Sequence, residues 1–166
     1  FGAQAYVDRY LGSRPEPTDP DQKDLYPYLR DPSAGPFRKK PEHAKLSAYF
    51  NLDNGAGSIR GIYTEENAAV VPIFEAWIRP LRDLGVTTVT MDTTGSTDHV
   101  PFDVAGIPGF QFIQDKLEYT GYTHHTNADT FDHLVPDDLK QASVVMATFL
   151  YHAAMRPERL PRKHLP

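Results

Sequence analysis

The fold is decided by residues 86–113, which read VTTVTMDTTGSTDHVPFDVAGIPGFQFI. Residues 86–91 are rich in β-branched side chains and predict a strand. Residues 102–106 end in glycine and predict a short helix that stops there. Residues 109–113 predict a second strand. Strands alternating with helices favour an α/β fold, in which helices sandwich a mixed, mostly parallel β-sheet.

The segments before this stretch extend the same alternation. Residues 44–52 predict a strand, with Leu46, Ala48, Phe50 and Leu52 on one face, and residues 60–64 predict a short one. A helix is predicted over residues 67–84, since apolar side chains recur there at helical spacing. Pro72 fits its first turn, Pro80 should kink or shorten it, and Gly85 should end it.

The two ends of the chain complete this outline. Residues 3–12 predict the end of a helix, whereas residues 13–42 lack any period and predict a long surface insertion that Tyr26, Tyr28 and Phe37 could pin down. Pro136 and two acidic residues open the last helix. Residues 1–155 therefore form the predicted α/β portion, and residues 156–166 a surface tail.

The composition excludes several classes of partner and site. The chain has 166 residues, 40% of them hydrophobic and 23% charged, as is typical of one globular domain. A net charge of −5 gives no reason to expect nucleic acid, and no apolar stretch approaches the roughly 20 residues of a membrane span. Seven histidines and no cysteine favour nitrogen and oxygen ligands for any metal.

Three polar loops follow predicted strands: Asp53-Asn54-Gly55, residues 93–99 and residues 122–129. Sites in open α/β sheets form at the carboxyl ends of strands, so all three loops could reach one crevice. Each loop also has a simpler interpretation. The first could be an ordinary turn, the second could cap the helix that carries Phe102, and the histidines of the third could lie on the surface.

The paired histidines His124 and His125 are expected to point to opposite faces, as neighbours do in an extended segment. Only one of them should then be a metal ligand. Asp129 could orient an imidazole from behind, as carboxylates often do around metal sites.

Taken together, the three loops resemble metallopeptidase family 28, the co-catalytic two-zinc aminopeptidases and carboxypeptidases. The resemblance rests on three stretches: Asn51-Leu52-Asp53-Asn54-Gly55; Ser96-Thr97-Asp98-His99-Val100-Pro101-Phe102 with Gly106-Ile107-Pro108; and His125-Thr126-Asn127-Ala128-Asp129-Thr130. It covers residues 1–155 and implies the C-terminal portion of a zinc exopeptidase catalytic domain.

The resemblance implies roles for the matching positions. Asp53 and His125 correspond to ligands of two different zinc ions, while Asp98, His99 and His124 correspond to positions that contact substrate. The family also requires a histidine, a bridging aspartate and a Glu-Glu pair that we do not find here. The general-base glutamate is therefore expected upstream of Phe1, and this chain alone is expected to be inactive.

The same resemblance suggests partners and location. A companion chain carrying the N-terminal half could complete the site, and the substrate would be a peptide or an amino-acid conjugate. Secretion or a periplasmic location is typical of the family. Two alternatives stay open: a glutaminyl cyclase-like zinc acyltransferase, and a non-catalytic binding domain of the same fold.

Overall fold

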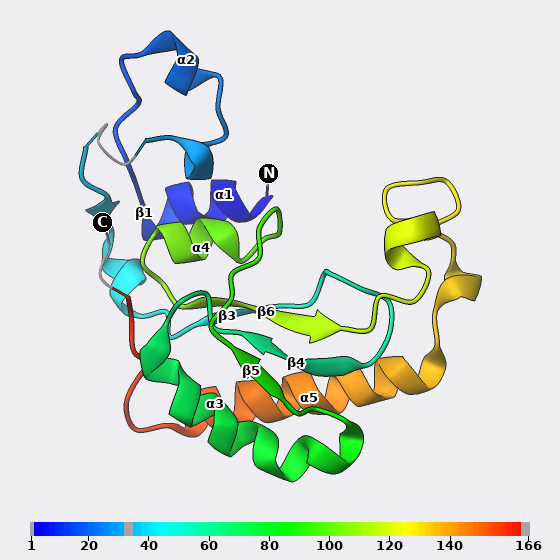
Figure 1. Ribbon diagram of the computed structural model, residues 1–166. Coiled ribbons are helices and arrows are strands. Elements are labelled where there is room, and N and C mark those ends of the chain that lie inside the picture. Colours follow the sequence, from blue (N-terminus) through cyan, green and yellow to red (C-terminus); the bar gives the residue numbers. More distant parts are fainter. Residues whose placement is uncertain (1, 32–34, 164–166) are drawn as a thin grey trace.

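An open sheet lies between two layers of helices in the computed structural model, which describes residues 2–31 and 35–163 (Figure 1). The strands are β1 (Gly12–Ser13), β2 (Arg38–Lys39), β3 (Tyr49–Asn51), β4 (Ile59–Tyr63), β5 (Thr88–Thr90) and β6 (Gly109–Gln114). The α-helices are α1 (Gly2–Tyr6), α2 (Pro20–Lys23), α3 (Val71–Ile78), α4 (Val100–Val104) and α5 (Pro136–Met155).

The main sheet has the strand order β3-β6-β4-β5. β3 pairs with β6 and β4 with β5 in parallel, whereas β4 and β6 are antiparallel. The predicted mixed, mostly parallel sheet is therefore confirmed. The same pairing makes β5 run opposite to β3 and β6, so the carboxyl end of β5 lies at the other edge of the sheet.

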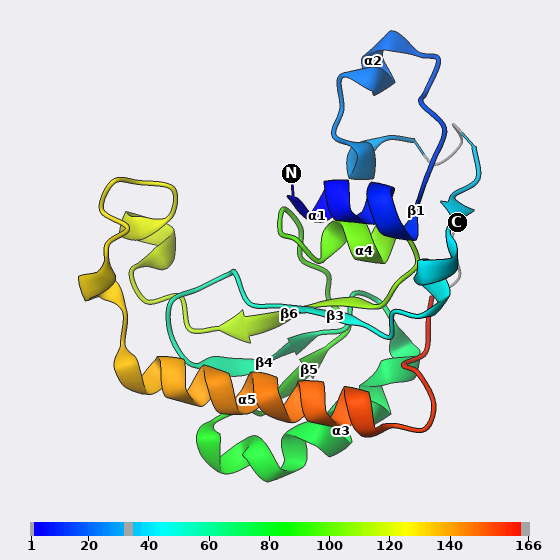
Figure 2. The ribbon, with the colours of Figure 1, turned by 180° about the vertical axis from the view of Figure 1, so that it is seen from behind.

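One face of the sheet is covered by α3 and α5, which lie side by side in both views (Figures 1 and 2). Phe149 of α5 is fully buried at the centre of this layer. Its ring centroid lies 5.1–5.8 Å from those of four aromatic side chains, Phe50, Phe74, Trp77 and Phe112. Burial of these rings, with edge-to-face contacts among them, anchors both helices to the sheet.

The opposite face carries α4, with α1 stacked on it (Figure 1). A second apolar cluster fills this layer and includes Val7, Leu11, Phe102, Ala105 and Ile107. The helix end predicted over residues 3–12 consists of α1 and the π-helical turn Val7–Leu11 that follows it, with Gly12 after its last residue. The two clusters confirm the prediction that helices sandwich the sheet.

The helix predicted over residues 67–84 changes type along its length. α3 ends at Ile78, and Arg79–Leu84 continue as a 3₁₀ helix that contains Pro80. Gly85 ends it in the left-handed conformation, with φ of 81°. The predicted shortening at Pro80 is therefore confirmed. Its physical reason is that proline lacks an N–H and clashes with the preceding turn of an α-helix.

The described residues of the predicted insertion, 13–31 and 35–42, have little regular structure. Its two ends pair as β1 and β2, which the sequence analysis did not anticipate. Among its aromatic residues, Phe37 packs against the second apolar cluster. Tyr26 and Tyr28 instead stack on each other, with ring centroids 5.8 Å apart.

The predicted surface tail is wrong for residues 160–163. Leu160 is buried within the main core, and the Asn67 side chain donates to the Pro161 carbonyl at 2.8 Å. Arg162 donates to the backbone oxygens of His43 and Leu46. A Pro-rich, basic composition predicted exposure, but specific long-range contacts hold this segment in place. Residues 164–166 lie outside the described part of the chain.

Within residues 2–31 and 35–163, we find no helix long and apolar enough to cross a membrane.

Candidate functional site

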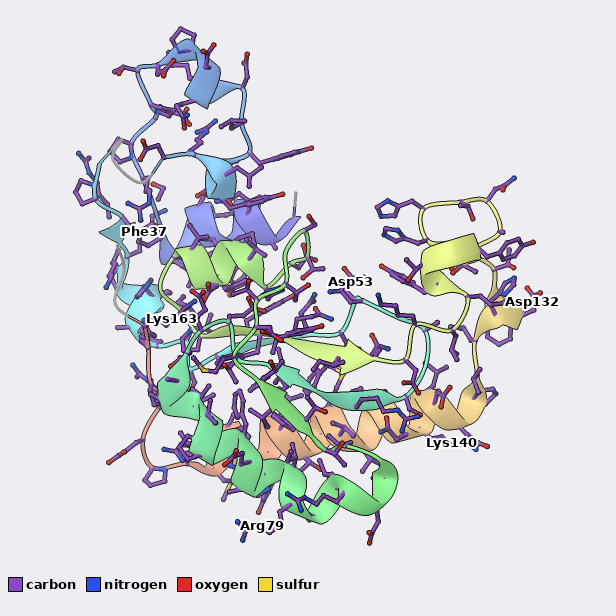
Figure 3. All side chains as sticks on the ribbon, viewed as in Figure 1. Phe37, Asp53, Arg79, Asp132, Lys140 and Lys163 are labelled. Atoms are coloured by element: carbon purple, nitrogen blue, oxygen red, sulfur yellow. The ribbon has the colours of Figure 1, made fainter. Side chains whose placement is uncertain are left out.

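A cavity of about 510 Å³ opens on the α4 side of the sheet, beside the segment that follows β6. It is lined by residues from all three predicted loops: Asp53 and Asn54; Thr94, Gly95, Ser96 and Thr97; and His124, His125 and Asp129. Figure 3 shows Asp53 at the bend after β3, between the α4 layer and the protruding segment 117–133. The expected convergence of the three loops is therefore observed.

Asp53 reaches the cavity because β3 is parallel to β6, so the segments that follow these two strands leave the sheet on the same side. Burial raises the pKa of the Asp53 carboxyl, and the negative charge of Asp98 raises it further. Nearby His124 and His125 act in the opposite direction. The turn after Asp53 is tied across the cavity, since the Asn54 amide donates to Thr94 Oγ1 at 3.1 Å. Asp53 thus belongs both to a turn and to the cavity wall.

The second loop reaches the cavity by a different route from the one expected. Because β5 runs antiparallel to β6, its carboxyl end lies at the opposite end of the strands from those of β3 and β6. Residues 91–98 therefore leave the sheet there and turn back over its α4 face. Ser96 takes a left-handed φ of 62° in this turn. The shared carboxyl edge that motivated the prediction therefore applies to two of the three loops.

The paired histidines do not point to opposite faces, because the segment is not extended. Tyr119–Thr123 form a π-helical turn, and His125 adopts a left-handed φ of 59°. The two imidazole rings stack with centroids 3.9 Å apart and an interplanar angle of 27°. Both histidines line the same cavity. Left-handed conformations at non-glycine residues often mark functional sites.

Tyr119 is a cavity residue that the sequence analysis missed. Its hydroxyl donates to the Asp53 carbonyl at 3.0 Å, and its ring centroid lies 4.7 Å from that of His124. Burial raises the pKa of the Tyr119 hydroxyl, with smaller contributions from Asp53 and Asp129. Only its closeness to the histidine pair in the sequence hinted at this position.

Asp129 lines the same cavity, and its role in orienting an imidazole stays a prediction. Asp98 borders a neighbouring depression formed with Tyr49 and Phe102. His99 is fully buried behind the second loop, where its ring bonds to Thr97 and to the Thr94 carbonyl. Its place here is in the support of the loop, and substrate contact by His99 would require that support to open.

The donor atoms in the cavity are of the kind that zinc binds, namely a carboxylate and imidazole nitrogens. Their number is too small for a closed site. Among the described residues, no three histidine, aspartate or glutamate side chains come close enough together to hold an ion. Asp53 and His125 therefore fit as partial contributions and leave most of the coordination to other groups.

Comparison with known proteins shows what this chain is similar to. Aminopeptidase YwaD of Bacillus subtilis is 31% identical over 81 residues, which are 48% of this chain and 18% of that aminopeptidase. No solved structure matches. The family model described as Peptidase family M28 matches residues 33–150, which include all three loops of the cavity. The chain therefore belongs to peptidase family M28.

Proposed function

We propose that this chain supplies part of the active site of a zinc-dependent exopeptidase. The observation that carries the proposal is that Asp53 and His125, distant in the sequence, line one cavity of about 510 Å³. Membership of a peptidase family supports peptide cleavage as the reaction. Zinc dependence and attack at a chain terminus are the proposed refinements.

In this proposal Asp53 and His125 each donate to a different zinc ion, with Asp53 Oδ and a His125 ring nitrogen as ligand atoms. When bound, such ions polarise a scissile carbonyl and lower the pKa of a bound water. The burial that raises the pKa of Asp53 would be offset by a bound cation, because a positive charge favours the carboxylate. Zinc binding should therefore displace more protons from Asp53 at mildly acidic pH, where more of this carboxyl is protonated, than at neutral pH.

The remaining residues of the cavity have roles that need no metal. The Tyr119 hydroxyl fixes the turn that carries Asp53. His124, packed between Tyr119 and His125, presents an N–H that could donate to a substrate carbonyl. The left-handed φ of His125 brings its ring beside that of His124. Together they would orient a peptide end against the two ligand residues.

In this proposal Asp53 and His125 give one ligand to each ion, and among the described residues no three histidine, aspartate or glutamate side chains come close enough together to hold an ion. The other ligands and the base would come from outside these residues, as a companion segment of polypeptide. We therefore expect the 166-residue chain to bind zinc weakly and to hydrolyse no peptide.

Zinc titration by calorimetry tests the ligand assignment. Asp53→Asn and His125→Ala should each weaken binding at least about tenfold, since each removes a direct ligand. Matched controls are Asp137→Asn and His152→Gln in α5, whose original side chains are not among those lining the cavity. Equal affinity of the cavity variants and the controls would refute the assignment.

Activity assays test the reaction type. The chain is supplied with the companion segment and given a peptide with free ends, its N-acetylated form and its C-amidated form. Zinc-dependent release of terminal amino acids from the free peptide, blocked by one modification, is expected. Hydrolysis by the 166-residue chain alone would overturn the incomplete-site proposal. Pyroglutamate formation instead of hydrolysis would support the glutaminyl cyclase alternative.

A further inference from the structure

Glu65 carries a buried carboxylate that belongs to no sequence motif and does not line the cavity. Glu65 follows β4, and its residue is only 4% exposed. A carboxylate is rarely buried unless it is paired or hydrogen-bonded, so its partners indicate what holds it there. The partners of this carboxylate, Thr94 and His99, both belong to the second loop.

The Glu65 carboxylate accepts from the backbone N–H of Thr94, with the nitrogen 3.3 Å from Oε1 and 3.2 Å from Oε2. His99 Nε2 lies 3.2 Å from the same Oε1. Thr94 and His99 bracket the turn of the loop, and Thr94, Gly95, Ser96 and Thr97 line the cavity. Residues 94–97 form what we call the second wall of the cavity. A single carboxylate therefore contacts both Thr94, at the start of this wall, and His99, just after its end.

The hydrogen positions on His99 follow from its neighbours. Its Nε2 faces two acceptors, the Thr94 carbonyl at 3.2 Å and the Glu65 carboxylate, so this nitrogen carries a proton. The other ring nitrogen, Nδ1, lies 2.5 Å from Thr97 Oγ1. The ring thus bridges Thr94 and Thr97, and Glu65 fixes the orientation of the ring.

Glu65 is itself held in an unusual backbone conformation. Its φ is 50°, and that of Glu66 is 61°, both in the left-handed region that non-glycine residues seldom adopt. Lys163 clamps this bend by donating to the Glu65 carbonyl at 2.5 Å and to Asp103 Oδ2 at 2.8 Å. Two consecutive left-handed residues persist only where the surrounding structure determines their conformation, and such positions cluster at functional sites.

We propose that Glu65 is the positioning residue of the cavity's second wall, acting through Thr94 and His99 rather than by contact with substrate. The wall is tied onward to the Asp53 turn, because Thr94 Oγ1 accepts from the Asn54 amide. Glu65 thereby helps to set the separation between the wall and the turn that carries Asp53. Relevance to peptide cleavage rests on the proposed function, but the positioning itself does not.

The test is NMR spectroscopy of the ¹⁵N-labelled chain without zinc or peptide, so its result is independent of the proposed function. Glu65→Ala should speed hydrogen exchange of the Thr94 amide at least about tenfold, because the amide loses its acceptor. The His99 ring nitrogens and the Asn54 side-chain amide should shift as well. Amides of β6 should be unchanged, which separates loop release from general destabilisation.

Glu66→Ala is the matched control, since Glu66 is the adjacent glutamate, is also left-handed, and is exposed. It should leave the signals of Thr94 and His99 unchanged. Two results would overturn the proposal. One is a Thr94 amide in Glu65→Ala that exchanges within about twofold of its original rate, and the other is an equally large increase of that rate in Glu66→Ala.

A second variant covers the case in which Glu65→Ala does not fold. Glu65→Gln keeps one acceptor oxygen for His99 but places an amide N–H₂ beside the Thr94 N–H. We expect a folded protein in which Thr94 exchanges faster while the His99 ring signals stay close to their original positions. Unchanged Thr94 exchange in this variant would contradict the positioning role.

Discussion

Acidification should destabilise this protein through one buried histidine, His43. The His43 ring lies between two parts of the chain that are far apart in sequence. Nε2 is 2.7 Å from the Ala105 carbonyl, and Arg162 Nη1 is 2.9 Å from Nδ1. A guanidinium can only donate, so Nδ1 accepts and Nε2 carries the proton of a neutral imidazole. Adding a second proton would remove the Arg162 bond and bury a charge beside another positive charge.

These surroundings lower the pKa of His43, with burial as the main cause and the charges of Arg162 and Lys39 acting in the same direction. The bond to Ala105 opposes them. In the unfolded chain the ring has its ordinary pKa of 6.5 and takes up a proton below that pH. The stability that His43 contributes is therefore present above pH 6.5 and is lost as the pH falls toward the lowered folded-state value.

The size of the loss has an upper limit. If the folded ring stays neutral throughout, linkage to a group of ordinary pKa removes about 2 kcal/mol of unfolding free energy between pH 7 and pH 5. Urea unfolding at pH 7, 6 and 5 measures this change. His43→Gln is the comparison, because glutamine can still donate to Ala105 and accept from Arg162 but does not titrate.

The variant should show a shallower fall in unfolding free energy between pH 7 and pH 5 than the original protein. Other titrating groups are common to both proteins, so their contributions cancel in the difference. Identical pH slopes would refute the conclusion that the buried ring is kept neutral in the folded state.

Two further predictions concern packing in and around the sheet. Phe149→Ala should lower the unfolding free energy, measured by denaturation, by about 3–5 kcal/mol, because it empties the centre of the aromatic core. In the same experiment Tyr151→Ala should change the unfolding free energy by less than about 1 kcal/mol, because Tyr151 lies on the same helix but is 62% exposed. Gly61→Ala should prevent folding or cost at least about 3 kcal/mol, since the added methyl would lie under 3 Å from a backbone oxygen of the neighbouring strand. Gly95→Ala, where an added methyl meets nothing within 4 Å, should be tolerated, and circular dichroism melting distinguishes the two.

Local signals in the sequence predicted the main strands and helices and several residues of the cavity, but not the β1–β2 pair or Tyr119. Pro80 and Gly85 act on the backbone within a turn of their own position, so the change of helix type and the helix end could be predicted from sequence. The apolar pattern of residues 109–113 likewise predicted a strand, now observed as Gly109–Gln114. Asp53 and His125 were identified as candidates because they stand in recognisable motifs, and both do line the cavity.

Only the tertiary structure decided how these parts are oriented. The direction of β5 depends on which strand it pairs with, and pairing is a long-range choice that the residues of β5 do not encode alone. The stacking of His124 on His125 depends on a left-handed φ at His125. Glu65 looked like any exposed glutamate in the sequence, and it is buried because Thr94 and His99 supply its hydrogen bonds. Hydrophobic periodicity and proline or glycine effects act over a few residues, whereas the burial of a charged group depends on partners brought together by the whole fold.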